Sequence, residues 1–133
     1  MILVDANIFM YAAGREGPQQ QPCRRFLERV VSGEGPDACT DCEVLQEILH
    51  RYRALGAEDV AFRVFDAVTH LGLPILDVTE RALLEARKML EDHPHLSTRD
   101  GIHLGVMREH AIEEVLSYDR GFSQVAWVRR REA

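Results

Sequence analysis

Short apolar runs alternate along this chain with longer segments whose apolar residues recur at helical spacing. The runs expected as strands are 2–4, 74–78 and 115–118, with 37–40 as a brief link or strand and 125–128 as a possible edge strand. The segments expected as helices are 7–13, 22–31, 43–52, 58–71, 79–90 and 97–110. Asn7 is expected to cap the first, Thr79 the fifth, and Ser97 or Thr98 to start the last, and the helix at 79–90 is expected to bury Leu83, Leu84 and Ala86. Strands separated by whole helices pair in parallel through right-handed crossovers. The alternation therefore predicts an α/β fold with helices on both faces of a mostly parallel sheet.

The length of 133 residues fits a single domain over 1–133, and the 46% hydrophobic content is enough for a core. No apolar run approaches the roughly 20 residues that span a bilayer. The first residues show no basic, apolar signal pattern, so a cytoplasmic location is expected. Three cysteines suggest no disulfide framework, and the pair Cys39 and Cys42 lacks a second pair for zinc.

The net charge of −6 argues against a broad electrostatic grip on nucleic acid. It does not exclude a nucleic-acid enzyme whose acidic residues gather around a metal. The basic run at 129–131 is expected to be a solvated tail.

Carboxylates follow the expected strands at their ends. Asp5 follows the first strand, Asp119 follows the strand at 115–118, and Asp77 lies near the end of the strand at 74–78. Ligands of open α/β sheets bind beyond the carboxyl ends of the strands. Acids gathered there repel one another unless a cation holds them, and Mg²⁺ or Mn²⁺ suits oxygen ligands. A structural alternative stays open, because Asp5 can be a cap and Asp119 a turn residue.

Two further acids fall on expected helices. Thr40 and Glu43 match a capping box, which gives Glu43 a structural role, whereas Glu47 lies at the border of an apolar stripe and can reach a cleft. Asp100 lies in a first helical turn, where the helix dipole is expected to lower its pKa. His103, three residues later, is expected to have a structural or supporting role rather than to bind metal.

In order, these segments resemble the PIN-domain ribonucleases, in particular the VapC-like toxins of bacterial toxin–antitoxin pairs. The matching stretches are ILVDAN at 2–7, VLQE at 44–47, RDGIH at 99–103 and LSYDRGF at 116–122. The resemblance covers nearly the whole chain. It implies a three-layer α/β/α sandwich and RNA cleavage that depends on Mg²⁺ or Mn²⁺.

The resemblance also implies roles for individual residues. Asp5, Asp100 and Asp119 would bind the metal, and Glu47 would act directly or through a water. Asn7 and Ser117 would orient ligands or waters around them. Candidates for phosphate contacts are Arg15, Arg99 and Arg120. The implied partners are a small antitoxin protein and a second copy of the chain in a homodimer.

Two other functions remain open at this point. The chain could bind RNA or protein without catalysis, or its metal centre could act on DNA or a phosphate monoester. Motifs of other enzyme classes, namely G-x-S-x-G, the P-loop and H-E-x-x-H, do not occur.

Overall fold

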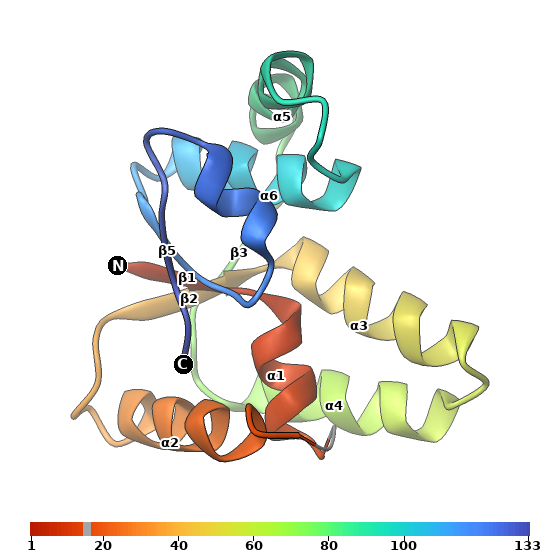
Figure 1. Ribbon diagram of the computed structural model, residues 1–133. Coiled ribbons are helices and arrows are strands. Elements are labelled where there is room, and N and C mark those ends of the chain that lie inside the picture. The colour runs from red at the N-terminus through yellow and green to blue at the C-terminus, as the bar shows by residue number, and fades with distance from the viewer. Residues whose placement is uncertain (15–16) are drawn as a thin grey trace.

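A computed structural model describes residues 1–14 and 17–133 of the chain. Figure 1 shows the elements in space. In chain order they are β1 (Ile2–Val4), α1 (Ala6–Ala12), α2 (Gln20–Val31), β2 (Ala38–Asp41), α3 (Cys42–Ala54), α4 (Glu58–His70), β3 (Ile75–Leu76), α5 (Glu80–Asp92), α6 (Thr98–Glu109), β4 (Glu114–Leu116), the 3₁₀ helix η1 (Arg120–Gln124) and β5 (Arg129–Arg131). This order confirms the predicted alternation of strands and helices.

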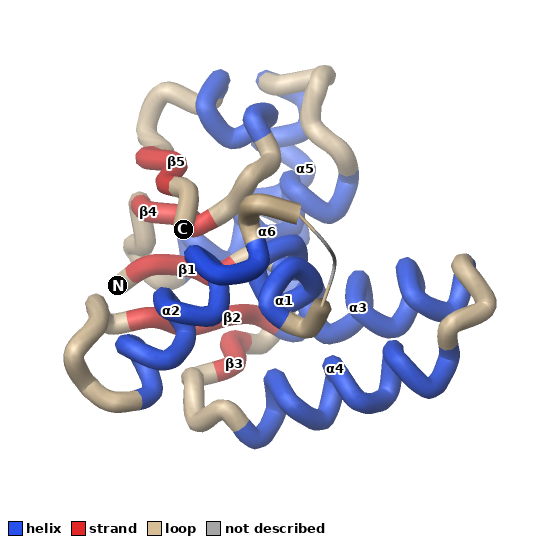
Figure 2. Tube along the Cα trace, turned by 60° about the horizontal axis from the view of Figure 1, so that its bottom comes forward, coloured by secondary structure: helices blue, strands red, loops and turns tan. Residues whose placement is uncertain are grey.

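The five strands form one sheet in the order β3-β2-β1-β4-β5, and every neighbouring pair is parallel (Figure 2). The chain first builds the sheet outward from β1 to β3 and then returns to add β4 and β5 on the other side of β1. The direction of winding therefore reverses between β1 and β4, and such a reversal leaves a crevice at the carboxyl ends of the two strands.

Side chains of β1 alternate between two cores, as the period of a strand requires. Ile2 and Val4 pack with helices α1 to α4, whereas Leu3 packs with α5, α6 and η1 on the opposite face. Helices thus cover both faces of the sheet, and Figure 1 shows the three layers. The predicted α/β/α sandwich is confirmed.

The caps of two helices differ from the prediction. Asp5, rather than Asn7, caps α1, and its carboxylate accepts a hydrogen bond from the Ala6 amide. Asp41, rather than Thr40, caps α3 by accepting from the Val44 amide at 2.9 Å. The predicted capping box of Thr40 and Glu43 is therefore wrong, because the Thr40 hydroxyl donates to the Val4 carbonyl of the neighbouring strand instead. The predicted caps of α5 and α6 by Thr79 and Ser97 are confirmed.

The C-terminal arginines are also placed differently from the prediction. They form the edge strand β5 instead of a solvated tail, and the predicted strand at 125–128 is wrong. Arg130 explains part of the difference, since its guanidinium donates to the Ser117 carbonyl at 2.8 Å and to the Ser123 hydroxyl at 2.8 Å. Backbone pairing with β4 and these two contacts outweigh the preference of a charged run for solvent.

Helix α5 buries a different stripe from the one predicted. Leu83 and Leu84 are 46% and 57% exposed, whereas Ala86 is buried as predicted, together with Ala82. A Cβ atom on Gly105 of α6 would collide with the Ala82 carbonyl. The two helices thus approach closely through small residues, and this approach turns the leucines outward. Among the described residues, no helix is both long and apolar enough to cross a membrane.

Candidate metal centre

The crevice between β1 and β4 gathers the predicted acids from distant parts of the chain. Asp5 directly follows β1 and Asp119 comes three residues after the end of β4. Asp100 lies in the first turn of α6, and Glu47 lies in the second turn of α3. The charges of Asp5 and Asp119 both raise the pKa of Asp100, and the charge of Asp5 raises the pKa of Glu47. All four predicted acids therefore lie in one electrostatic neighbourhood.

Asp5 is held in place by several hydrogen bonds. It is 3% exposed. One carboxylate oxygen accepts from the Ala6 amide at 2.7 Å, so the same side chain caps α1. The other oxygen accepts from the Ser117 hydroxyl at 2.6 Å and from the side-chain amide of Asn7 at 3.1 Å. The structural and functional interpretations of Asp5 are thus compatible, since the cap leaves the carboxylate facing the other acids.

Ser117 connects the ends of β1 and β4. Its hydroxyl donates to Asp5 and accepts from the Asn7 side chain at 3.1 Å and from the Asp119 amide at 2.9 Å. Asn7 also accepts from the Tyr118 amide at 3.3 Å. Asn7 and Ser117 thus form a hydrogen-bonded link between Asp5 and the chain around Asp119.

Asp100 and Asp119 differ in burial. Burial, together with the charges of Asp5 and Asp119, raises the pKa of Asp100 from the usual 3.8 to about 7. The predicted lowering of this pKa by the helix dipole is thus wrong, because burial among like charges outweighs the dipole. Asp119 is exposed and accepts from the Gly121 amide at 2.8 Å, so it serves as a turn residue at the rim of the cluster.

Glu47 lies at the mouth of the site. Its side chain is 13% exposed. Burial is the main cause of its raised pKa, and the charge of Asp5 adds to it, whereas two arginines act in the opposite direction. Arg51 lies 3.5 Å and Arg99 3.9 Å from a Glu47 oxygen, and Arg99 also lies 3.6 Å from Glu43. Glu43 therefore has a charge partner at the rim in place of the predicted cap.

Two other arginines, Arg15 and Arg120, are predicted to contact phosphate. Arg15 falls outside the described residues. Arg120 is exposed at the start of η1. Asp77 follows β3, which is separated from β1 by β2, and its carboxylate contacts the Cys42 thiol at 3.9 Å. Arg99 lies beside two of the acids, Glu43 and Glu47.

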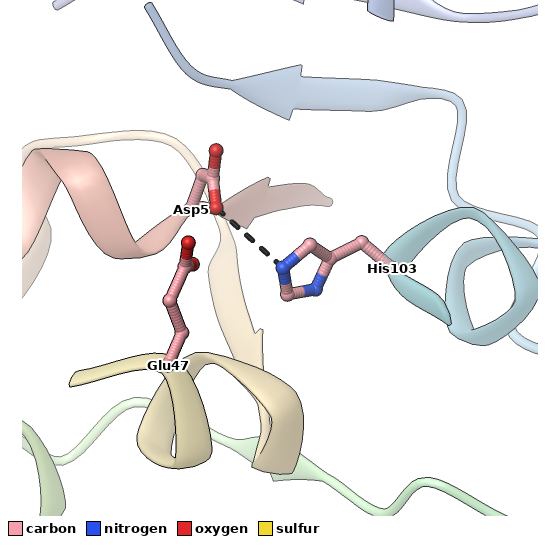
Figure 3. Close-up of side chains that lie close together, drawn as sticks. All are labelled: Asp5, Glu47 and His103. Atoms are coloured by element: carbon pink, nitrogen blue, oxygen red, sulfur yellow. Dashed lines mark ion pairs between the residues drawn. The ribbon is translucent and has the colours of Figure 1, made fainter. Parts of the chain in front are cut away.

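Sequence reasoning missed the pairing of Asp41 with His103. Both side chains are fully buried, and Nδ1 of His103 lies 2.7 Å from an Asp41 oxygen. The opposite ring nitrogen, Nε2, lies 3.6 Å from an Asp5 oxygen (Figure 3). Burial lowers the pKa of His103, but the charges of Asp41, Asp5 and Asp100 outweigh it and raise the pKa to about 10. The position of Asp41 at the end of a strand, directly before a helix, was the signal in the sequence.

The donor set fits a divalent cation. Three potential ligand atoms, one each from Asp5, Glu47 and His103, lie within 4.8 Å of one another. Figure 3 shows these side chains converging from the end of β1, from α3 and from α6. Nε2 of His103 is buried and has no hydrogen-bond partner among residues 1–14 and 17–133. A cation beside these carboxylates would offset their mutual repulsion.

The fold and the acidic crevice define an α/β protein built around a carboxylate centre. Comparison with known families identifies it further, because the PIN domain matches residues 2–128. The chain belongs to the PIN-domain family.

Similar proteins within that family include VapC ribonucleases. VapC ribonuclease Mb1869c of Mycobacterium bovis is 39% identical over 130 residues, covering 98% of this chain and 98% of the relative. Ribonuclease VapC13 of Mycobacterium tuberculosis gives the same values. Ribonuclease VapC23 of M. tuberculosis is 33% identical over 122 residues, covering 90% and 93% of the two chains.

Solved structures support the fold. M. tuberculosis VapC20, described as a toxin that cleaves the sarcin–ricin loop, has a TM-score of 0.76 at 20% identity and covers 96% of this chain and 97% of its own. VapBC2 of Rickettsia felis, solved bound to a promoter DNA fragment, has a TM-score of 0.75 at 14% identity, with coverage of 100% and 99%. At these identities the likeness concerns the fold.

Proposed function

We propose that this chain is a metal-dependent endoribonuclease and the toxin of a toxin–antitoxin pair. The observation that carries the proposal is the convergence of Asp5, Glu47, Asp100 and Asp119 at the carboxyl ends of β1 and β4. The ribonuclease names of relatives at 39% identity over nearly the whole chain support RNA as the substrate.

The acids would hold one or two Mg²⁺ or Mn²⁺ ions. When bound, such an ion lowers the pKa of a water and offsets negative charge on the phosphate that is attacked. The chain's own contribution is rigidity: Ser117 and Asn7 fix the Asp5 carboxylate, and the Asp5 cap ties it to α1. Ligands that are fixed before the substrate arrives need little rearrangement during the reaction.

Phosphate recognition would be local, because the chain as a whole is acidic. Arg99 and Arg51 lie at the rim of the crevice beside Glu47, and their side chains are 30% and 44% exposed. Guanidinium groups in this position can turn toward an RNA phosphate once the acids are neutralised by metal.

The partners also belong to this proposal. Several solved structures with the same fold are toxin–antitoxin complexes, which supports an antitoxin protein that covers the crevice. We also propose a homodimer, for which sizing at micromolar concentration is the test. A monomer under those conditions would contradict it.

The test of the activity is cleavage of a labelled structured RNA with Mn²⁺, with EDTA, and with Asp5→Asn in place of the wild type. We expect cleavage by the wild type with Mn²⁺, and none with EDTA or with the variant. Asp66→Asn, an exposed change on α4, is the matched control and should leave cleavage unchanged. Full activity of a folded Asp5→Asn variant would refute the proposal, and equal cleavage of a matched DNA would change the substrate class.

A further inference from the structure

We infer that His103 is a ligand of the metal in this site through Nε2, and that the Asp41–His103 pair makes the site favour Mn²⁺, or a similar transition-metal ion, over Mg²⁺. The inference rests on the metal centre of the proposed function and adds to it a nitrogen ligand and a choice of ion.

The first support is the buried Nε2 atom. His103 is 0% exposed, and this nitrogen has no hydrogen-bond partner among the described residues. Buried polar atoms are normally satisfied, so an unpartnered one calls for a group that the polypeptide does not supply. Nε2 lies 3.6 Å from an Asp5 oxygen, and the closely spaced ligand atoms of Asp5 and Glu47 complete the set. The missing partner is therefore a cation, because the Asp5 and Glu47 carboxylates beside Nε2 would bind one as well.

The second support is the contact on the other side of the ring. Metal-binding histidines usually donate their second ring N–H to a carboxylate, which fixes the tautomer and aims the free nitrogen at the ion. Nδ1 of His103 lies 2.7 Å from the buried carboxylate of Asp41. When a metal binds, Nδ1 would keep its proton for Asp41 and Nε2 would release its own, and the freed lone pair would face Asp5. The contact thus has the arrangement expected of a histidine ligand.

Asp41 is itself rigidly held. Its other oxygen accepts from the Val44 amide at 2.9 Å and so caps α3, the helix that carries Glu47. One buried carboxylate therefore sets both the orientation of the His103 ring and the start of the helix that presents Glu47. Asp41 acts as a positioning residue for two members of the ligand set.

A mixed set of ligands has consequences for the choice of ion. Mg²⁺ takes oxygen ligands almost exclusively and keeps much of its water, whereas first-row transition-metal ions accept imidazole nitrogen as well. A site formed by Asp5, Glu47 and His103 should therefore bind Mn²⁺ more tightly than Mg²⁺. Replacing the imidazole should reduce that preference.

The direct test uses Mn²⁺ alone as the probe, with no substrate. Pulsed EPR of the Mn²⁺-loaded protein should show a ¹⁴N coupling from a bound imidazole, and growth with ¹⁵N-histidine should replace it with a ¹⁵N coupling. A variant that retains His103 as its sole histidine should keep the signal, and His103→Gln should lose it. The sole-histidine variant changes only exposed or half-exposed positions, so the test does not depend on the folding of His103→Gln.

Calorimetric titration provides the second readout. We expect His103→Gln and Asp41→Asn to weaken Mn²⁺ binding by about 10- to 100-fold, and Mg²⁺ binding by much less. His110→Gln, an exposed change just beyond the end of the same helix, is the matched control and should change neither affinity. Absence of a nitrogen coupling in the Mn²⁺-loaded wild type, or equal losses for the two ions, would overturn the inference. Metal-dependent RNA cleavage that requires Asp5 would still stand in that case, so the two proposals can fail separately.

Discussion

Replacing Asp100 by asparagine should stabilise the metal-free protein above pH 7. Asp100 is 9% exposed, and burial together with the charges of Asp5 and Asp119 raises its pKa to about 7, against 3.8 for an ordinary aspartate. The carboxyl group therefore ionises less readily in the folded chain than in the unfolded chain. Its ionisation reduces stability as the pH rises from about 4 to about 7, and the full loss is present above that range.

The size of the effect follows from the difference between the two pKa values. About three pKa units at 1.36 kcal/mol each amount to about 4 kcal/mol at pH 8. At pH 5 the loss of stability corresponds to only about one pKa unit of this difference, which amounts to about 1.5 kcal/mol. Asparagine keeps the shape of the side chain and cannot ionise. The stability advantage of Asp100→Asn over the wild type should therefore grow by about 2 to 3 kcal/mol between pH 5 and pH 8.

The measurement is urea unfolding in EDTA at the two pH values, followed by circular dichroism. Asp66→Asn, an exposed change on α4, is the control and should stay within about 0.5 kcal/mol of the wild type at both. Mn²⁺ should narrow the difference at pH 8, because binding at 100 times the dissociation constant stabilises the wild type by about 2.7 kcal/mol and the variant would lack one of the proposed ligands. The reasoning is refuted if Asp100→Asn is no more stable than the wild type at pH 8 in EDTA.

The sequence predicted well those features of the fold that depend on pattern. Alternating apolar runs and helical segments implied a parallel sheet, and the acids after the runs at 2–4 and 115–118 implied the edge where they meet. Position along a parallel strand fixes where a residue emerges, so Asp5 and Asp119 could be placed without coordinates. What these acids do chemically remains a prediction.

The errors arose where neighbours in space decide between local alternatives. Thr40 and Asp41 are both good helix caps, and pairing with β1 drew the Thr40 hydroxyl to Val4 and left the cap to Asp41. The position of Asp41 at a strand end was a signal that it could matter, but its partner His103 lies 62 positions away, so no local pattern could pair the two. The pKa of Asp100 was misjudged for the same reason, because its helix position was visible in the sequence but its burial among charges was not.

Three further changes test the packing and the supports of the site. Gly105→Ala should destabilise the protein by about 1 to 3 kcal/mol in thermal unfolding, because the new methyl group meets the Ala82 carbonyl where α5 and α6 approach; an increase in stability, as helix propensity alone predicts, would contradict this packing. Arg99→Gln should weaken RNA binding and reduce its dependence on salt by about one phosphate contact, whereas an unchanged salt slope would show that Arg99 does not contact the backbone. Ser117→Ala removes a buried hydroxyl that donates to Asp5 and accepts from the Asp119 amide, so we expect a loss of about 1 to 3 kcal/mol in unfolding free energy together with slower cleavage. Because the two acids keep their charges in this last variant, slower cleavage at saturating Mn²⁺ would show that their alignment matters to the reaction as well as their charge, and unchanged cleavage in a destabilised protein would limit the role of Ser117 to the fold.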